Sequence, residues 1–197
     1  MKKNIMKMVA LGTLGLVVGV GSYQLFKTDV AIGYTSSRQF ENIGELHEKA
    51  KLIVTGEVVT QQVEPMQNEQ LGITMDALTK TTFKINKVYK NDKTTQFKPG
   101  DEITVYEPAG IVEEGIADTY FSTDGYRLME KDATYLLFLE SGVKQGDWVV
   151  YGYQGKYNID KKDRDEAKFL QGHYKVRFDK LQREAKEKYD SFAQETL

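Results

Sequence analysis

The sequence predicts a mainly β protein with helices, built around one small antiparallel β-barrel or sandwich. Short β-branched and aromatic segments alternate with turn residues through the middle of the chain, which is typical of such folds. An uncharged apolar segment precedes them, and an amphipathic helical pattern follows them. We therefore expect four parts: a transmembrane or signal helix at 1–26, a tether at 27–41, the β-barrel domain at 42–160 and a C-terminal helical extension at 161–197.

The first 26 residues predict where the rest of the protein lies. Lys2, Lys3 and Lys7 precede an uncharged stretch of 19 residues, Met8 to Phe26, close to the roughly 20 that span a bilayer. This order of charged and apolar regions is typical of a signal peptide or an N-terminal anchor. Lysines on the short N-terminal side keep that side in the cytoplasm. We expect a single-pass protein of the cell membrane, with residues 8–26 in the membrane and the domain outside.

Cleavage of this segment is the alternative, and it makes the protein secreted. Small residues at Val20-Gly21-Ser22, and more weakly at 31–33, stand where a signal peptidase cleaves. The chain has no cysteine, which excludes both a lipid-modified cysteine and disulfide bonds. The exported part must therefore be stabilised by packing.

The charge balance narrows the choice of partners. After residue 26 the chain carries 24 basic and 29 acidic residues, a net charge of −5. Affinity for nucleic acid is built from Lys and Arg side chains that neutralise phosphates, so this balance argues against a nucleic-acid partner. It also argues against attachment to anionic lipid through charge. The membrane is expected as a partner only through residues 8–26.

The domain begins with a short helix over residues 43–51, for which Asn42 supplies an N-cap. The β-branched segment 52–59 predicts a strand. Gly56 within that segment indicates a bulge or a close approach of another backbone. Residues 64–77 show little periodicity and predict a loop.

Three further segments predict strands. Residues 82–89 alternate between apolar and polar, with a change of parity at Val88 that indicates a bulge or the end of the strand. Residues 103–106 follow the turn residues 99–101. Residues 134–139 form the most apolar run after the N-terminus and suit a central strand. The buried face of these strands is expected to contain Leu52, Val54, Phe83, Ile85, Val105, Leu137 and Leu139.

The remaining segments have different signals. Residues 110–131 are rich in Gly, Asp and Glu and predict a long connection. Residues 148–153 and 156–159, joined at Gln154-Gly155, predict a β-hairpin. From Tyr174 to Phe192, apolar residues recur at spacings of three and four, which predicts an amphipathic helix. We expect its apolar stripe to pack on the barrel; the alternative is a helix that binds a second copy or a partner.

Four segments carry a resemblance to a known group: LHEKAKLIVTGEVV (46–59), TTFKINKVYKND (81–92), KPGDEITVYEPAGI (98–111) and KDATYLLFLE (131–140). Together they resemble a group of uncharacterised exported or membrane-anchored domains of Gram-positive bacteria. The resemblance covers about residues 42–159 and excludes the C-terminal helix. It implies a small OB-like β-barrel and carries no catalytic residues.

A search for catalytic and metal-binding patterns finds little support for either. His47 and His173 lie far apart, and neither belongs to an HExxH pattern. Ser122-Thr123-Asp124-Gly125 is typical of a turn, and the adjacent Glu113 and Glu114 lack the separation that glycoside hydrolysis requires. An acidic cluster departs from the calcium-binding EF-hand pattern and is interpreted as a solvated charge run: Asn158, Asp160, Asp163, Asp165 and Glu166. We therefore expect no metal, no cofactor and no enzymatic activity.

Aromatic side chains offer the remaining candidate site. Trp148, Tyr151 and Tyr153 follow one another closely, and aromatic faces on an OB-like barrel can stack on a ligand. With an acidic chain, a glycan or protein partner is favoured over nucleic acid. The expected function is a binding or interaction module outside the cytoplasm. The alternatives are an exported hydrolase or inhibitor-like domain, or an accessory subunit of a cell-envelope complex.

Overall fold

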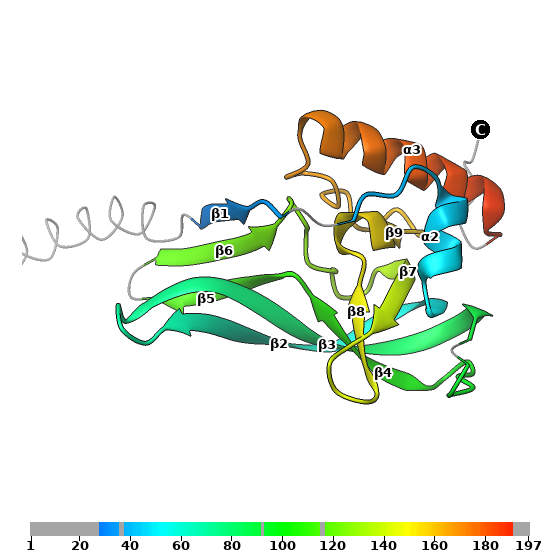
Figure 1. Cartoon of the computed structure of the whole chain (residues 1–197), viewed down its shortest axis with the longest axis horizontal. Coiled ribbons are helices and arrows are strands. Elements are labelled where there is room, and N and C mark those ends of the chain that lie inside the picture. Colours follow the sequence, from blue (N-terminus) through cyan, green and yellow to red (C-terminus); the bar gives the residue numbers. More distant parts are fainter. Residues whose placement is uncertain (1–27, 36–37, 92, 115–116, 191–197) are drawn as a thin grey trace, which may run out of the picture.

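The computed structural model describes residues 28–35, 38–91, 93–114 and 117–190 (Figure 1). The segment 8–26, on which the membrane and signal-peptide predictions rest, lies outside these residues. Within them, no helix has the length and apolar character that crossing a membrane requires. The described chain is mainly β with two α-helices, as the sequence predicts, and its strands form two sheets.

The larger sheet contains six strands in the order β2-β3-β4-β8-β7-β9, and β2 also pairs with β7. Five of these strands therefore form a closed ring. One pair in the ring, β4 with β8, is parallel, so the predicted antiparallel arrangement is wrong at this point. Parallel neighbours need a long crossover, and three other strands lie between β4 and β8 in the chain. The bounds are β2 Leu52–Asn68, β3 Ile73–Lys90, β4 Glu102–Glu107, β7 Thr134–Ser141, β8 Asp147–Val150 and β9 Lys156–Asn158.

The short helix before the ring and the first strand of the ring, β2, agree with the sequence-based predictions. Helix α2 spans Ile43–Lys49, and the Asn42 side chain accepts a 2.9 Å hydrogen bond from the backbone N–H of Glu45. The pairing of β2 with β3 shifts register beside Gly56. A Cβ at this glycine would lie 2.0 Å from the carbonyl oxygen of Lys84. Both the predicted bulge and the predicted close approach are confirmed.

The smaller sheet occupies segments where the sequence predicts no strand. Its order is β1-β6-β5, with β1 at Asp29–Gly33, β5 at Ala109–Glu114 and β6 at Ala117–Thr123. The predicted tether thus contains a strand, and the predicted long connection 110–131 contains two. The predicted loop 64–77 is the outer half of the long β2–β3 hairpin. Packing explains these differences: a Cβ at Gly110 of β5 would lie 2.7 Å from the Ala77 Cβ of that hairpin.

The predicted hairpin after Trp148 is also wrong. Strands β8 and β9 do not pair with each other; both pair antiparallel with the same edge of β7, one after the other. A short 3-10 helix, η1 at Gly152–Gly155, separates them. The Gln154-Gly155 pair therefore belongs to a bend along one edge of a sheet, because β7 is long enough to receive two short strands.

The core has two parts on either side of the larger sheet. All seven side chains that the sequence assigns to the core are buried, each at most 1% exposed. The second part lies between the sheet, α2 and helix α3 (Gly172–Lys188). Phe178 and Leu181 of α3 are buried there, which confirms that the helix packs on its own domain. Phe192, at the end of the predicted helix, lies outside the described residues.

Candidate functional site

A cavity of about 320 Å³ lies beside η1, between the ends of β7 and β8 and the turn that follows β6. Its volume falls at the lower end of the range typical of small-molecule sites. The lining residues come from segments that are far apart in the sequence: Thr35, Arg38, Pro108, Thr123, Asp124, Glu140, Val150, Tyr151, Gly152, Tyr153 and Gln154.

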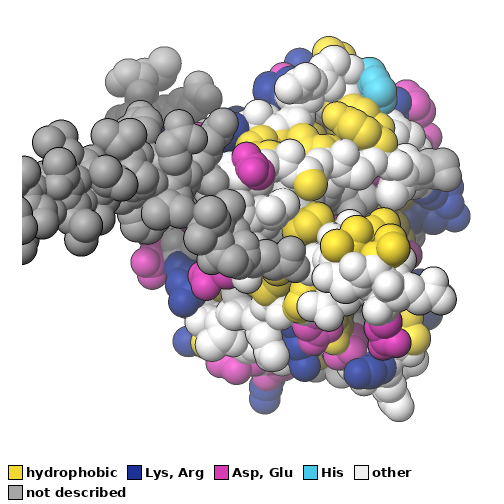
Figure 2. All heavy atoms as spheres, turned by 90° about the vertical axis from the view of Figure 1, so that its left-hand side faces the viewer, with side chains coloured by type: hydrophobic (Ala, Val, Ile, Leu, Met, Phe, Trp, Pro, Cys, Tyr) yellow, Lys and Arg dark blue, Asp and Glu magenta, His cyan; other side chains and the backbone are white. Residues whose placement is uncertain are grey.

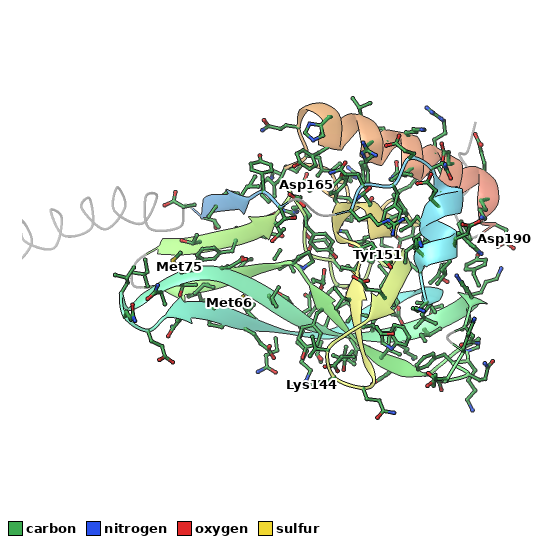
Figure 3. All side chains as sticks on the ribbon, in the orientation of Figure 1. Met66, Met75, Lys144, Tyr151, Asp165 and Asp190 are labelled. Atoms are coloured by element: carbon green, nitrogen blue, oxygen red, sulfur yellow. The ribbon has the colours of Figure 1, made fainter. Side chains whose placement is uncertain are left out.

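Two of the three aromatic residues singled out by the sequence line this cavity, and the third does not. Tyr151 and Tyr153 flank the first residue of η1, and the half-buried Tyr151 is labelled in Figure 3. Trp148 is only 4% exposed and lies in the core of the strand ring, where its ring packs edge-on against Phe97. Strand alternation cannot place all three side chains together, because η1 interrupts the strand after Val150.

One wall of the cavity comes from the chain between β1 and α2. The Gln154 side chain holds this segment from one side: its Oε1 accepts from the Phe40 backbone N–H at 2.8 Å, and its Nε2 donates to the Arg38 carbonyl at 3.0 Å. Asp124 holds it from the other side by accepting two hydrogen bonds from Thr35. The described residues of this wall are therefore held in two places, by η1 and by the turn after β6.

Asp124 stands in a turn directly after β6. The sequence predicts a turn at residues 122–125, but Ser122 and Thr123 are the last two residues of β6, and the turn begins after them. The Asp124 φ of 54° lies in the left-handed region, which Asp tolerates better than most residues, and Gly125 follows with a φ of 78°. This turn aims the Asp124 carboxylate at the wall segment. The sequence indicates the turn but not this role, because the bonded partner is 89 residues away.

The polar groups of the cavity suit a hydrogen-bonding ligand. Burial raises the pKa of Tyr151 to about 12, and the nearby Glu140 carboxylate adds to the effect. Burial likewise raises the pKa of Tyr153 to about 12. Both phenols therefore stay protonated at neutral pH. The Tyr151 hydroxyl donates to the Lys49 carbonyl at 3.4 Å, whereas the buried Tyr153 hydroxyl has no hydrogen-bond partner among the described residues and can donate to a ligand. Arg38 and Glu140 are exposed at the rim with opposite charges, and Pro108 and Val150 supply apolar surface.

A second cluster of polar side chains lies inside the fold, and two of its members, Glu107 and Lys156, are not predicted from the sequence. Glu107 is fully buried, and its carboxylate accepts hydrogen bonds from the Tyr126 hydroxyl at 2.9 Å and the Met129 backbone N–H at 2.8 Å. Burial raises the pKa of this carboxyl. Lys156 is 2% exposed; its Nζ donates to the Arg127 carbonyl at 2.8 Å and lies 3.8 Å from the Asp163 carboxylate. These bonded groups fasten the chain after β6 to the sheet.

The acidic cluster of the sequence analysis divides between this interior and the surface. Asp163 and Glu166 are buried, whereas Asp165 is exposed and pairs with Lys168 at 3.0 Å. Burial raises the pKa of Glu166 to about 7, and its Oε1 accepts a 2.7 Å hydrogen bond from the Asn158 backbone N–H. In the part of the chain that the structure describes, no three His, Cys, Asp or Glu residues are grouped so as to hold a metal ion.

Comparisons with known proteins give no relative: no protein-family model matches the chain, and no curated protein is significantly similar to it.

Proposed function

We propose that this protein is a binding module outside the cytoplasm that takes a glycan or a short peptide in the cavity beside η1. The observation that carries this proposal is the convergence of Tyr151, Tyr153, Arg38 and Glu140 on one cavity of about 320 Å³. Aromatic faces with a few hydrogen-bonding groups are typical of sites that orient a polar ligand. Residues 8–26 would hold the module at the cell membrane, or be removed if the protein is secreted.

The sheet arrangement supports an OB-like description of the domain. Five strands, β2, β3, β4, β8 and β7, pair around a ring, and the OB-fold is a five-stranded barrel with ligand-binding loops. In this chain two strands of the smaller sheet, β5 and β6, are inserted between β4 and β7, whereas β1 precedes β2. The end of β6 and the turn after it supply Thr123 and Asp124 to the cavity, so this insertion would take part in binding.

The two alternative functions have less support. For a hydrolase, two free carboxyl groups at a defined separation would be needed, but the Asp124 carboxylate is engaged by Thr35. For an accessory subunit that docks through α3, an exposed apolar stripe would be needed, but Phe178, Leu181 and Ala185 are buried in this chain. A ligand in the cavity therefore remains the function that we propose.

Binding of the purified full-length protein to glycan and peptide arrays, followed by calorimetry on any hit, tests the proposal. Tyr151→Ala should weaken binding at least tenfold, because it removes an aromatic side chain that lines the cavity. Tyr106→Ala is the matched control, since Tyr106 is a part-exposed tyrosine of β4 that does not line the cavity. Equal affinity in both variants, or no bound ligand on either array, would count against the site.

A further inference from the structure

The tip of the β2–β3 hairpin exposes large apolar side chains. Met66, Leu71, Ile73 and Met75 are 52%, 66%, 48% and 60% exposed. Figure 3 shows Met66 and Met75 at the far end of this hairpin, away from α3. Single exposed apolar residues are ordinary, but a group of them at one end of a molecule marks an interaction surface.

These side chains point to both faces of the hairpin. Ile73 and Met75 share the face of the buried Ala77, because alternate residues of a strand point the same way. Met66 lies opposite Asp76 and therefore shares the other face. Leu71 belongs to the turn between the strands. A groove on a partner protein would cover one face of the hairpin, whereas membrane lipid would surround both faces.

The chain enters the described structure at this same end. Strand β1 begins at Asp29 and runs parallel to β6 over five residue pairs, so its direction is set by the sheet. Figure 1 shows β1 beginning at the end of the molecule where the hairpin tip lies. In Figure 2, which views this end of the molecule, hydrophobic side chains are exposed in several groups, and charged side chains lie mostly at the edges and below them.

The length of chain before β1 places this end close to the membrane. Two residues of chain reach at most about 7 Å, and Thr28 stands two residues after Phe26, the last residue of the apolar stretch. If residues 8–26 span the membrane, Thr28 must lie at its outer surface. The hairpin tip is then directed at the lipid.

We propose that the β2–β3 hairpin tip inserts into the outer surface of the membrane that holds the N-terminal anchor. The inference rests on the anchor in the proposed function. A tethered contact needs little affinity of its own, because the anchor gives the tip a high effective concentration at the lipid. Glu64, Glu69 and Asp76 flank the tip, so anionic headgroups should weaken the contact rather than strengthen it. Insertion would fix the domain's orientation on the membrane.

The absence of cysteine from the chain makes a direct test possible. Leu71→Cys in the full-length protein is labelled with an environment-sensitive fluorophore and reconstituted into phosphatidylcholine vesicles. Val176→Cys is the matched control, because Val176 is 71% exposed on α3, away from the tip. We expect blue-shifted emission at position 71 and iodide quenching several-fold weaker than at position 176. Adding phosphatidylglycerol to the vesicles should reduce this difference.

Flotation of the vesicles separates failure of the inference from failure of the anchor. If the protein floats with the vesicles but positions 71 and 176 are quenched equally, the inserted tip is overturned and the anchor stands. If the protein does not float, the anchor itself is overturned, and the inference with it. Shielding of position 71 that requires native membranes and is absent in pure lipid would assign the tip to a protein partner, which also overturns the proposal.

Discussion

Asp124 and Thr35 are joined by two hydrogen bonds of 2.8 Å, one from the Thr35 backbone N–H and one from its hydroxyl. These bonds connect the end of β6 to the chain that follows β1. They attach a wall of the cavity to the sheet. The cavity geometry therefore depends on a contact between residues that are 89 positions apart.

Replacing Asp124 should loosen this wall. Asp124→Ala removes both acceptors and places alanine at a φ of 54°, so we expect a loss of about 1–3 kcal/mol in the free energy of unfolding. Asp124→Asn should cost less, because asparagine keeps one acceptor oxygen and tolerates the left-handed region. Urea titration of the three proteins measures the difference. Equal stability of the alanine and asparagine variants would show that the side-chain bonds contribute nothing.

Gly56→Ala should be the most damaging change in β2. Its Cβ would lie 2.0 Å from the Lys84 carbonyl oxygen and 2.6 Å from the Phe83 ring, which leaves no room without moving a strand. We expect a loss of more than about 4 kcal/mol or failure to fold. Gly33→Ala is the control, since a Cβ there has its nearest neighbour at 4.0 Å. Thermal unfolding of both variants decides whether the close approach matters.

Leu137→Ala tests the core of the strand ring. Leu137 is completely buried and pairs with Val54 across β7 and β2. Removing its side chain should cost about 2–5 kcal/mol, the usual range for a leucine in a packed core. Val143→Ala, at a fully exposed position between β7 and β8, should change stability by less than about 0.5 kcal/mol. An unchanged melting midpoint for Leu137→Ala would contradict the assignment of β7 to the core.

Truncation after Gly172 should lower the melting temperature by removing α3. The helix covers the outer face of the sheet, where Phe178 packs against Tyr157 at 5.6 Å and Tyr189 against Phe138 at the same distance. Glu184 also accepts a 2.8 Å hydrogen bond from the Ile43 backbone N–H at the start of α2. Differential scanning calorimetry measures the change. A truncated protein that melts like the full chain would make α3 a candidate partner-binding helix.

Glu166 should make stability depend on pH. Burial raises its pKa in the folded state from an ordinary value of 4.5 to about 7, so the folded state binds more protons than the unfolded state between these values. The contribution of Glu166 to the free energy of unfolding is therefore fully present below about pH 4.5 and is lost as the pH rises through 7. The total loss is about 3 kcal/mol. Glu166→Gln should remove this dependence and be more stable than the wild type at pH 8. Urea unfolding at several pH values between 4 and 8 measures this. If the free energy of unfolding changed with pH by the same amount in both proteins, the raised pKa would be contradicted.

Local signals in the sequence account for much of the fold. Three examples are the Asn42 cap, the alternation around Phe83 and Ile85, and the apolar stripe of α3. Each of these signals involves residues that are near neighbours along the chain. Hydrophobic periodicity reports which face of such an element is buried. For these elements, burial in the structure agrees with the pattern.

The smaller sheet and the cavity depended on tertiary structure. Val30 of β1 is exposed at 47% and pairs with Tyr120 of β6, so its strand has no buried face to produce an alternating pattern. Tyr151 and Tyr153 could be named as candidates from the sequence, but Trp148 could not be separated from them. That separation required η1, whose position follows from two short strands sharing one edge of β7. The sequence by itself determined the elements whose buried residues recur at a regular spacing. Pairing between distant segments decided the sheet order, the cavity and the end of the molecule at which the chain enters. The reason is that contacts between distant segments leave no periodic pattern in either segment alone.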